Sequence, residues 1–392
     1  DANNFTWAPN GEYLVLYSDE TSEDPSGLYM VDVLSHVKTP ITFGDQSIIL
    51  QDISPKGRYI LFSINKIDEF NSELTNQIMY QYNIKTNKLE TLWNKTGDSR
   101  AKYSPNGKQL LVTAGPSFFG KIGMNVKNGA APNEYDIQAY IYTIKSQNIE
   151  AITKDFKSSI LEAHWHAMNV NYIYFRVAER SFTNVYQYTI KTKNFDLLPL
   201  KIDVINSFSF AKQQPLFVYF GNSVLNSKKL YVAHLELGEI QLIEQPEEVY
   251  FKNMKFGITE EWSFKNKEGV SIEGRLYYPP NFDETKKYHL IAYYYGGANG
   301  SERNFRGGYP INLFSANGYM VYVFQPTGAI GFGQDFSAQY NDWGKKVMEE
   351  IIKGSQEVCS NHPFIDASKV GCLGAGYGGY LTMYLINETD IF

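Results

Sequence analysis

The clearest chemical pattern in this 392-residue chain lies between Val370 and Tyr384. A short apolar run leads into Gly374-Ala-Gly376-Tyr-Gly378, which is followed by an apolar stretch with helical spacing. The pattern Gly-x-Ser-x-Gly predicts a strand, a sharp turn and a helix, with a serine at the tip of the turn that attacks an acyl carbon. The flanking glycines let the backbone bend and let helix and strand pack closely. Here the tip is Gly376, so the scaffold is typical of acyl transfer while the nucleophile is absent.

This strand, turn and helix form the nucleophile elbow of an α/β-hydrolase, in which the triad follows the chain order Ser, Asp, His. The sequence stops at Phe392, sixteen residues after Gly376, and all six histidines precede the elbow. We therefore expect that the acid and the base lie beyond this sequence and that the sheet ends early. The elbow is expected near the centre of that sheet, next to an exposed edge that invites association.

Other residues that could do chemistry have simpler interpretations. His164 and His166 could present two imidazoles on one strand face, but without a nearby acidic or cysteine partner a packed position is expected rather than a metal site. Asp342 and Asp366 lie where helix or turn caps are expected.

The two cysteines give no sign of a disulfide. Cys359 lies in a predicted helix and Cys372 in the strand before the elbow. We expect two buried free thiols rather than a disulfide or a metal site.

Composition excludes several classes of protein. The hydrophobic fraction of 43% and the aromatic fraction of 15% indicate a globular chain rich in strands. The net charge is −6 and the Lys and Arg residues are scattered, so the sequence shows no basic cluster that would bind nucleic acid or an anionic membrane surface. No apolar run approaches the roughly 20 residues that span a bilayer.

The first two-thirds of the chain repeats a turn followed by a strand. Pro-x-Gly segments with prolines at 9, 55 and 105 are followed by apolar runs at 13–17, 59–62 and 110–112. The prolines are 46 and 50 residues apart, which is the period of four-stranded propeller blades.

A second repeat supports the first. Segments 80–86, 140–146 and 186–192 alternate aromatic and polar residues, with weaker copies at 28–33 and 229–235. Together they predict a β-propeller portion of about five blades in residues 1–255. A tandem of unrelated β-hairpins is the simpler alternative, and two independent signatures with one period argue against it.

The pattern changes near residue 256. Residues 258–278 alternate like a strand pair, and the strands predicted afterwards are 289–295, 319–325 and 370–373. Helices are predicted at 309–317, 342–360 and 377–386. Alternation of strands and helices predicts a parallel sheet covered on both faces. Residues 256–392 are thus expected to form the N-terminal part of an α/β-hydrolase domain.

Three stretches of this second region resemble the prolyl oligopeptidase family of serine peptidases, particularly its dipeptidyl-peptidase-like and acylaminoacyl-peptidase-like members. They are residues 292–297, residues 323–334 and the elbow with its Gly-Tyr-Gly-Gly-Tyr sequence at 376–380. The propeller portion before them is what this family carries. Each motif alone is weak to moderate, and all three in order after a propeller are specific.

The resemblance implies roles for three positions. Gly376 takes the position of the nucleophile, the phenol of Tyr295 matches one oxyanion-hole donor, and the backbone N–H of Tyr377 matches the other. One further core aromatic is the alternative for Tyr295. Glu179 resembles weakly the residues that capture a substrate amine in dipeptidyl-peptidases, but no second adjacent glutamate accompanies it.

The resemblance implies cleavage of short peptides by acyl transfer without a cofactor. The sequence itself does not give the compartment, and the resemblance suggests an extracytoplasmic one. The loss of serine at 376 is explained either by an engineered or assignment change in an active peptidase, or by a natural pseudoenzyme that binds peptides or acts as a scaffold. The expected partners are short peptides and, for the chain itself, either a second copy or the missing C-terminal segment.

Overall fold

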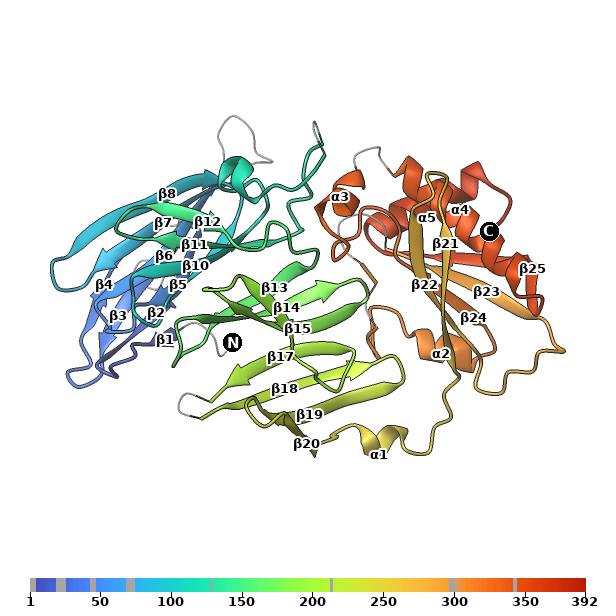
Figure 1. Cartoon of the computed structure of the whole chain (residues 1–392), viewed down its shortest axis with the longest axis horizontal. Coiled ribbons are helices and arrows are strands. Elements are labelled where there is room, and N and C mark those ends of the chain that lie inside the picture. The colour runs from blue at the N-terminus through green and yellow to red at the C-terminus, as the bar shows by residue number, and fades with distance from the viewer. Residues whose placement is uncertain are drawn as a thin grey trace.

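The computed structural model of the chain describes residues 5–18, 26–42, 47–67, 75–127, 130–211, 214–295, 300–301, 303–340 and 344–392 (Figure 1). Strands dominate up to residue 244, and strands mixed with helices follow from residue 259. None of the helices in the described ranges is long and apolar enough to cross a lipid bilayer.

The strand-rich part consists of four-stranded antiparallel groups in chain order. Three are separate sheets: β1 (Phe5–Trp7), β2 (Tyr13–Ser18), β3 (Gly27–Asp32) and β4 (Lys38–Pro40); β5 (Ser47–Ile53), β6 (Tyr59–Ile67), β7 (Thr75–Asn83) and β8 (Lys88–Thr96); β9 (Ser99–Tyr103), β10 (Gln109–Ala114), β11 (Gln138–Thr143) and β12 (Asn148–Ala151). A short 3-10 helix, η1 (Gly120–Gly123), lies between β10 and β11.

Two further groups are joined into one sheet by the parallel pair Thr183 and Val204. They are β13 (Ser159–Trp165), β14 (Tyr172–Glu179), β15 (Phe182–Thr189) and β16 (Asn194–Leu197), then β17 (Val204–Phe210), β18 (Leu216–Ser223), β19 (Asn226–His234) and β20 (Glu239–Glu244). In the described part of the chain no strand pairing joins the first group to the last, so the series is open and not a closed ring.

Successive groups bury apolar layers against each other. Because side chains alternate across a strand, one strand serves two layers: Ile60 and Phe62 of β6 face the first group, whereas Leu61 between them faces the third. In the same way, Leu111 of β10 packs against the fourth group. A fourth layer, which includes Phe208 and Phe217, joins the last two groups. Each interior group is therefore fixed by its neighbours on both faces.

The predicted Pro-x-Gly turns are confirmed. Gly11, Gly57 and Gly107 have φ of 73°, 64° and 69°, and each donates its N–H to the carbonyl three residues earlier at 2.8 to 2.9 Å. Left-handed φ values of this kind are accessible to glycine without a steric cost. Each turn delivers the chain into the second strand of its group.

The second repeat corresponds to the third strands of the groups, β7, β11 and β15. Each of these strands ends in a hairpin with a non-glycine residue at positive φ, namely Asn87 (53°), Gln147 (56°) and Lys193 (59°). The weaker copies fall on β3 and β19, which are also third strands. The common position explains why the two signatures share one period.

The C-terminal sheet has the order β21-β22-β24-β23-β25. Its strands are β21 (Thr259–Lys265), β22 (Ser271–Tyr277), β23 (Tyr288–Tyr293), β24 (Met320–Phe324) and β25 (Ile365–Leu373). The helices of this part are α1 (Glu248–Phe251), α2 (Ile311–Ala316), α3 (Gln334–Ser337), α4 (Lys345–Asn361) and α5 (Tyr377–Glu388), with the 3-10 helix η2 (Ala338–Tyr340). The last three strands of the order are parallel, and β21 and β22 are antiparallel.

Helices lie on both faces of this sheet, as expected. Val347 and Ile351 of α4 and Leu381 of α5 join one core, and Ile311 of α2 joins the other together with Val224 of the strand-rich part. The predicted elements are present with shifted ends, and residues 341–343, which include Asp342, are outside the described ranges. The short helices α1 and α3 were not predicted.

One expectation about the sheet is wrong. In the described residues β25, the strand that leads into the elbow, pairs only with β23 and lies at the edge of the sheet, not near its centre. The boundary at residue 255 between the two regions stays a prediction.

The turn at Gly107 gives a test of the repeat. A Cβ at this position would meet nothing closer than Pro55 Cδ at 3.6 Å, so the cost of Gly107→Ala is conformational and should be about 1 kcal/mol. Gly107→Asn should cost less, because asparagine tolerates left-handed φ. Urea unfolding of both variants measures the difference, and equal losses for Ala and Asn would contradict this account of the turn.

Candidate functional site

The predicted elbow is a strand, a turn and a helix in the structure. β25 ends at Leu373, Gly376 has φ 52° and ψ −118°, and α5 begins at Tyr377. The N–H of Tyr380 donates to the carbonyl of Gly376 at 3.1 Å, which ties the turn to the first turn of the helix. An L-residue rarely adopts this backbone conformation, so any side chain at 376 would be held in a strained geometry.

The flanking glycines are required by backbone contacts. A Cβ on Gly374 would lie 2.5 Å from the carbonyl carbon and oxygen of Gly378. A Cβ on Gly378 would lie 2.7 Å from the carbonyl oxygen of Tyr295 and 2.8 Å from that of Tyr294. The first turn of α5 thus lies directly against the backbone that follows β23. This approach places residue 295 beside the elbow.

Position 376 has room for a side chain, and that side chain would meet Tyr295. A Cβ at 376 would lie 3.4 Å from the phenol oxygen of Tyr295, which is an ordinary van der Waals contact. Tyr295 is half-buried just beyond the end of β23. The motif around it, residues 292–297, is described only through 295, because Gly296 and Gly297 lie outside the described ranges.

Tyr377 offers its backbone to the turn rather than its phenol. Its side chain packs against the core, and a Cβ on Gly344 would lie 2.8 Å from the Tyr377 phenol oxygen, so the ring points toward the start of α4. The first amides of an α-helix have no acceptor inside the helix, and the helix dipole makes this end attractive to negative charge. The 12 residues of α5 therefore aim a positive helix end at the elbow.

Cys372, in the strand that leads into the elbow, lies in a polar cluster. The hydroxyls of Tyr294 and Thr382 are 2.9 Å apart, and Thr382 also donates to the carbonyl of Gly378 at 2.9 Å. Burial raises the pKa of the Cys372 thiol, and hydrogen bonds with Tyr294 and Thr382 oppose this only in part. A thiol with a raised pKa is a poor nucleophile. Cys372 therefore does not replace the missing serine.

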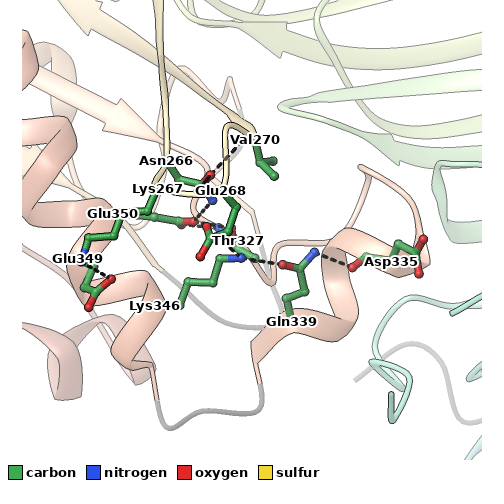
Figure 2. Close-up of polar contacts among 10 residues, drawn as sticks. All are labelled: Asn266, Lys267, Glu268, Val270, Thr327, Asp335, Gln339, Lys346, Glu349 and Glu350. Carbon is green, nitrogen blue, oxygen red and sulfur yellow. Dashed lines mark hydrogen bonds and ion pairs between the residues drawn. The ribbon is translucent and has the colours of Figure 1, made fainter. Parts of the chain in front are cut away.

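The loop after β24 is anchored by a buried carboxylate (Figure 2). Glu350 of α4 is 2% exposed and accepts from Asn266 Nδ2 at 2.8 Å, from the N–H of Thr327 at 2.8 Å and from its hydroxyl at 2.5 Å. Burial raises the pKa of Glu350, and these hydrogen bonds act against the rise. Because both oxygens are satisfied, the carboxylate fixes the start of the loop to α4 and to the β21–β22 turn.

Beside it, Lys346 extends the polar network toward α3. Its ammonium pairs with Glu268 at 3.3 Å and donates to Gln339 Oε1 at 2.7 Å (Figure 2). The Gln339 amide donates in turn to the carbonyl of Asp335 at 2.8 Å. The network links α4 to the part of the loop that touches the strand-rich region.

The same loop docks onto the strand-rich region. Gln334 accepts from the N–H of Asn125 at 2.8 Å and donates to the carbonyl of Gly123 at 2.9 Å. Ser337 donates to Asp136 Oδ2 at 2.6 Å, and both residues are buried. The contacts join two parts of the chain that are about 200 residues apart. They hold the two regions in the arrangement shown in Figure 1.

His164 and His166 are packed in the strand-rich part, as expected, but His164 has an acidic partner that was not predicted from the sequence. His164 Nε2 lies 2.6 Å from Glu162 Oε1, and its ring packs edge-on against Phe208. The ring of His166 lies among Tyr174 and other aromatics, and burial lowers its pKa. Residues two apart share a strand face, so the sequence 162–164 carried the signal for the pair.

The other candidate residues have structural roles. Asp366 Oδ1 accepts from the N–H and the hydroxyl of Ser368, so it caps a local turn as expected. Glu179 accepts from Asn184 Nδ2 at 2.7 Å and from the Tyr186 hydroxyl at 3.0 Å, at the wall of a cavity of about 460 Å³.

Both cysteines are free, and both are half-buried rather than fully buried. Burial also raises the pKa of Cys359. Within the described ranges no group of three or more His, Cys, Asp or Glu side chains could hold a metal ion.

The glycines of the elbow should differ in their tolerance of a methyl group. Gly374→Ala and Gly378→Ala force a Cβ into backbone atoms and should destabilise the protein more than Gly376→Ala. Gly376→Ala meets only backbone strain and should cost about 1–3 kcal/mol. Chemical unfolding of the three variants gives the ranking. The packing account is wrong if Gly376→Ala is the most costly of the three.

Asp136 should make the docked loop sensitive to pH. Burial is the main cause that raises its pKa from 3.8 to about 6, against hydrogen bonds from Ser337 and Ser159 that lower it. The folded protein therefore holds this proton more tightly than the unfolded chain, and the resulting stability is present below about pH 4 and is lost as the pH rises through about 6.

Asp136→Asn stays neutral throughout this range. Relative to the unmodified chain it should gain up to about 3 kcal/mol in unfolding free energy between pH 4 and pH 7. Urea midpoints of both proteins at the two pH values test this, and the shared titration of other groups cancels in the difference. Parallel pH profiles would show that Asp136 keeps an ordinary pKa.

The C-terminal part of the chain is similar to a known protein family. Residues 305–392 match the model of the prolyl oligopeptidase family, Peptidase_S9. The chain is 26% identical over 215 residues to YuxL of Bacillus subtilis, described as an uncharacterized peptidase, and the match covers 55% of this chain and 32% of that protein. It is 23% identical over 342 residues to dipeptidyl-peptidase 5 of Porphyromonas gingivalis, covering 86% of this chain and 48% of that protein.

Solved structures agree in fold. The acylaminoacyl peptidase of Pyrococcus horikoshii superposes with a TM-score of 0.66 at 16% identity, over 100% of this chain and 69% of that one. A prolyl endopeptidase superposes with a TM-score of 0.65 at 13% identity, over 98% of this chain and 62% of that one. The chain spans about half or less of the length of the two sequence relatives. The elbow thus lies in a stretch of the chain whose sequence matches the prolyl oligopeptidase family.

Proposed function

We propose that this chain is built as a serine-type peptidase of the prolyl oligopeptidase family, with a scaffold that cleaves short peptides by acyl transfer, and that the chain is inactive because Gly376 takes the place of the nucleophile. One observation carries the proposal: a Cβ at position 376, in a turn with φ 52° and ψ −118°, would lie 3.4 Å from the Tyr295 phenol oxygen. A nucleophile placed here would attack a carbonyl beside a hydroxyl donor. This is the arrangement that acyl transfer requires.

In this proposal the oxyanion of the tetrahedral intermediate lies between two donors. One is the phenol hydroxyl of Tyr295, and the other is the backbone N–H of Tyr377 at the positive end of α5. Donors aimed at a developing charge are worth on the order of 10²–10³ in rate each. The strand-rich region acts as a β-propeller portion beside an α/β-hydrolase portion and limits access to short peptides.

The inactivity follows from the side chains present. Gly376 has no hydroxyl, and Cys372 has a raised pKa. All six histidines of the 392 residues precede the elbow, whereas the base of this fold follows it. Without the serine, only the oxyanion donors and substrate binding remain, and in a well-studied protease these leave about 10³–10⁴ over the rate in water.

A non-catalytic peptide-binding or scaffold protein is the second candidate. Gly376 itself favours it, since a natural loss of the nucleophile would leave the binding surface in place. The intact contacts of Gly374 and Gly378 favour a recent or artificial loss instead, although the same glycines pack the fold. The codon at position 376 in the native gene separates the two candidates.

Labelling with a fluorophosphonate probe tests the proposal. The unmodified chain should not react, and Gly376→Ser in the 392-residue polypeptide should not react either, because a serine hydroxyl without an adjacent base is a poor nucleophile. The same change in a polypeptide that continues through a complete catalytic domain with its Asp and His should restore labelling. Mass spectrometry of the modified peptide locates the label.

Tyr295→Phe in that extended serine variant is the matched control. It keeps the ring and removes only the hydroxyl, so it should slow labelling by about 10²-fold or more while the folded stability stays close to that of the parent. Labelling of the unmodified 392-residue chain near the elbow would overturn the claim of inactivity. An extended serine variant that folds and does not label would favour the pseudoenzyme.

A further inference from the structure

A polar cavity of about 200 Å³ opens between the first strands of three consecutive strand groups. It is lined by residues of β5, β9 and β13, with two further residues from β10. Its polar side chains include Gln51, Arg100, Lys102 and Glu162. The cavity lies outside the elbow and takes no part in the chemistry proposed there.

Two cations of β9 line this cavity. β9 alternates buried and exposed residues, so Arg100 and Lys102 lie on one face, while Ala101 between them is 1% exposed on the other. The structure records no hydrogen bond or ion pair between either cationic side chain and any other described residue. Like charges two residues apart on one strand face are about 7 Å apart and repel each other. An anion between them would remove this repulsion.

The acidic groups nearby are engaged elsewhere. Glu162 binds His164 at 2.6 Å and Arg176 Nε at 3.1 Å, and the hydrogen bond from His164 is the main cause that lowers its pKa to about 2. Its charge is therefore shared with two partners from β13 and β14. Neither Arg100 nor Lys102 is among the ion-pair partners recorded for Glu162.

Asp52 of β5 is the second acidic neighbour, since the charge of Lys102 lowers its pKa slightly. Its two oxygens accept from the N–H groups of Tyr103 at 2.7 Å and Ile53 at 2.9 Å. Burial outweighs the hydrogen bonds and the charge of Lys102 and raises the pKa of Asp52 to about 6. The ionised form of this carboxyl is therefore disfavoured at its buried position. Asp52 is held by the backbone and is not an ion-pair partner for Lys102 in the structure.

The wall behind the cations is fixed. Gln51 Oε1 accepts from the N–H of Ala101 at 3.0 Å, and its Nε2 donates to Ser63 Oγ at 3.0 Å. The first bond joins β5 to β9, and the second holds the Gln51 amide to β6. A guanidinium on such a frame can bind a carboxylate through two parallel hydrogen bonds, and the ammonium adds a second positive charge.

We propose that Arg100 and Lys102 form a binding site for an anionic group and that its ligand is a carboxylate of a short peptide. The identification of the ligand as a peptide rests on the proposed function, whereas the anion site rests on the cavity and its charges. The site selects peptides with an acidic side chain over isosteric neutral ones. A peptide carboxylate and a free inorganic anion such as phosphate both present negatively charged oxygens, so either could bind to this site.

Isothermal titration calorimetry with two matched tripeptide amides, Gly-Ala-Glu-NH2 and Gly-Ala-Gln-NH2, tests the proposal on the unmodified 392-residue chain. The glutamate peptide should bind about tenfold more tightly at low salt, and the difference should shrink at high salt because exposed charges are screened. Arg100→Gln and Lys102→Gln should each reduce the preference several-fold. Lys108→Gln, an exposed lysine in the β9–β10 turn, is the matched control and should leave it unchanged.

Inorganic phosphate, titrated separately and as a competitor, distinguishes the two sources of the anion. Phosphate that competes with the glutamate peptide, with both losing affinity in Arg100→Gln, supports the proposal. Equal affinity for the two peptides overturns the anion site and leaves the proposed function standing. Binding of phosphate without binding of either peptide overturns the peptide as ligand. The fluorophosphonate labelling tests the function independently of all these outcomes.

Discussion

The close approach of two backbones at the elbow is the constraint on which the C-terminal region depends. The start of α5 lies so near the chain after β23 that no side chain fits at Gly378, and so near residue 374 that none fits there either. This contact fixes the turn between them and brings the phenol of Tyr295 next to position 376. Packing and site geometry therefore have a common cause, and this contact does not depend on a side chain at 376.

A second constraint holds the two regions together. The loop after β24 is fixed at its start by the buried Glu350 and docks through Gln334 and Ser337 on the strand-rich region. At Glu350 and at the docking residues, polar groups are buried, and a buried polar group without a hydrogen bond would lower the stability of the fold. The loop therefore has one well-determined position. This gives a physical reason for the polar residues Thr327 and Gln334 within the largely apolar and glycine-rich motif at residues 323–334.

Much of the fold could be predicted from local patterns. Positive φ at Gly11, Gly57 and Gly107 is readable from Pro-x-Gly, and alternation along 80–86 identifies a third strand. The order of strands in the C-terminal sheet was not readable, because pairing between distant segments leaves no local trace. The edge position of β25 was missed for that reason.

The candidate site was predictable to a similar extent. The types of residue at 374, 376 and 378 indicated the elbow, and the motif around Tyr295 indicated a donor. Contacts such as that of Ser337 with Asp136 were not predictable, since they join segments 201 residues apart through single side chains. The pair of Glu162 and His164 could have been predicted, because residues two apart on a strand lie on the same face, but it was not.

A crystal structure of Gly376→Ser would test the central claim most directly. The account predicts that residue 376 keeps a positive φ near 52° and that the serine side chain lies beside the Tyr295 phenol, with its Cβ about 3.4 Å from the phenol oxygen. A turn that relaxes to negative φ, or a Tyr295 ring that faces away from residue 376, would contradict the claim that this chain retains the geometry of an acyl-transfer elbow.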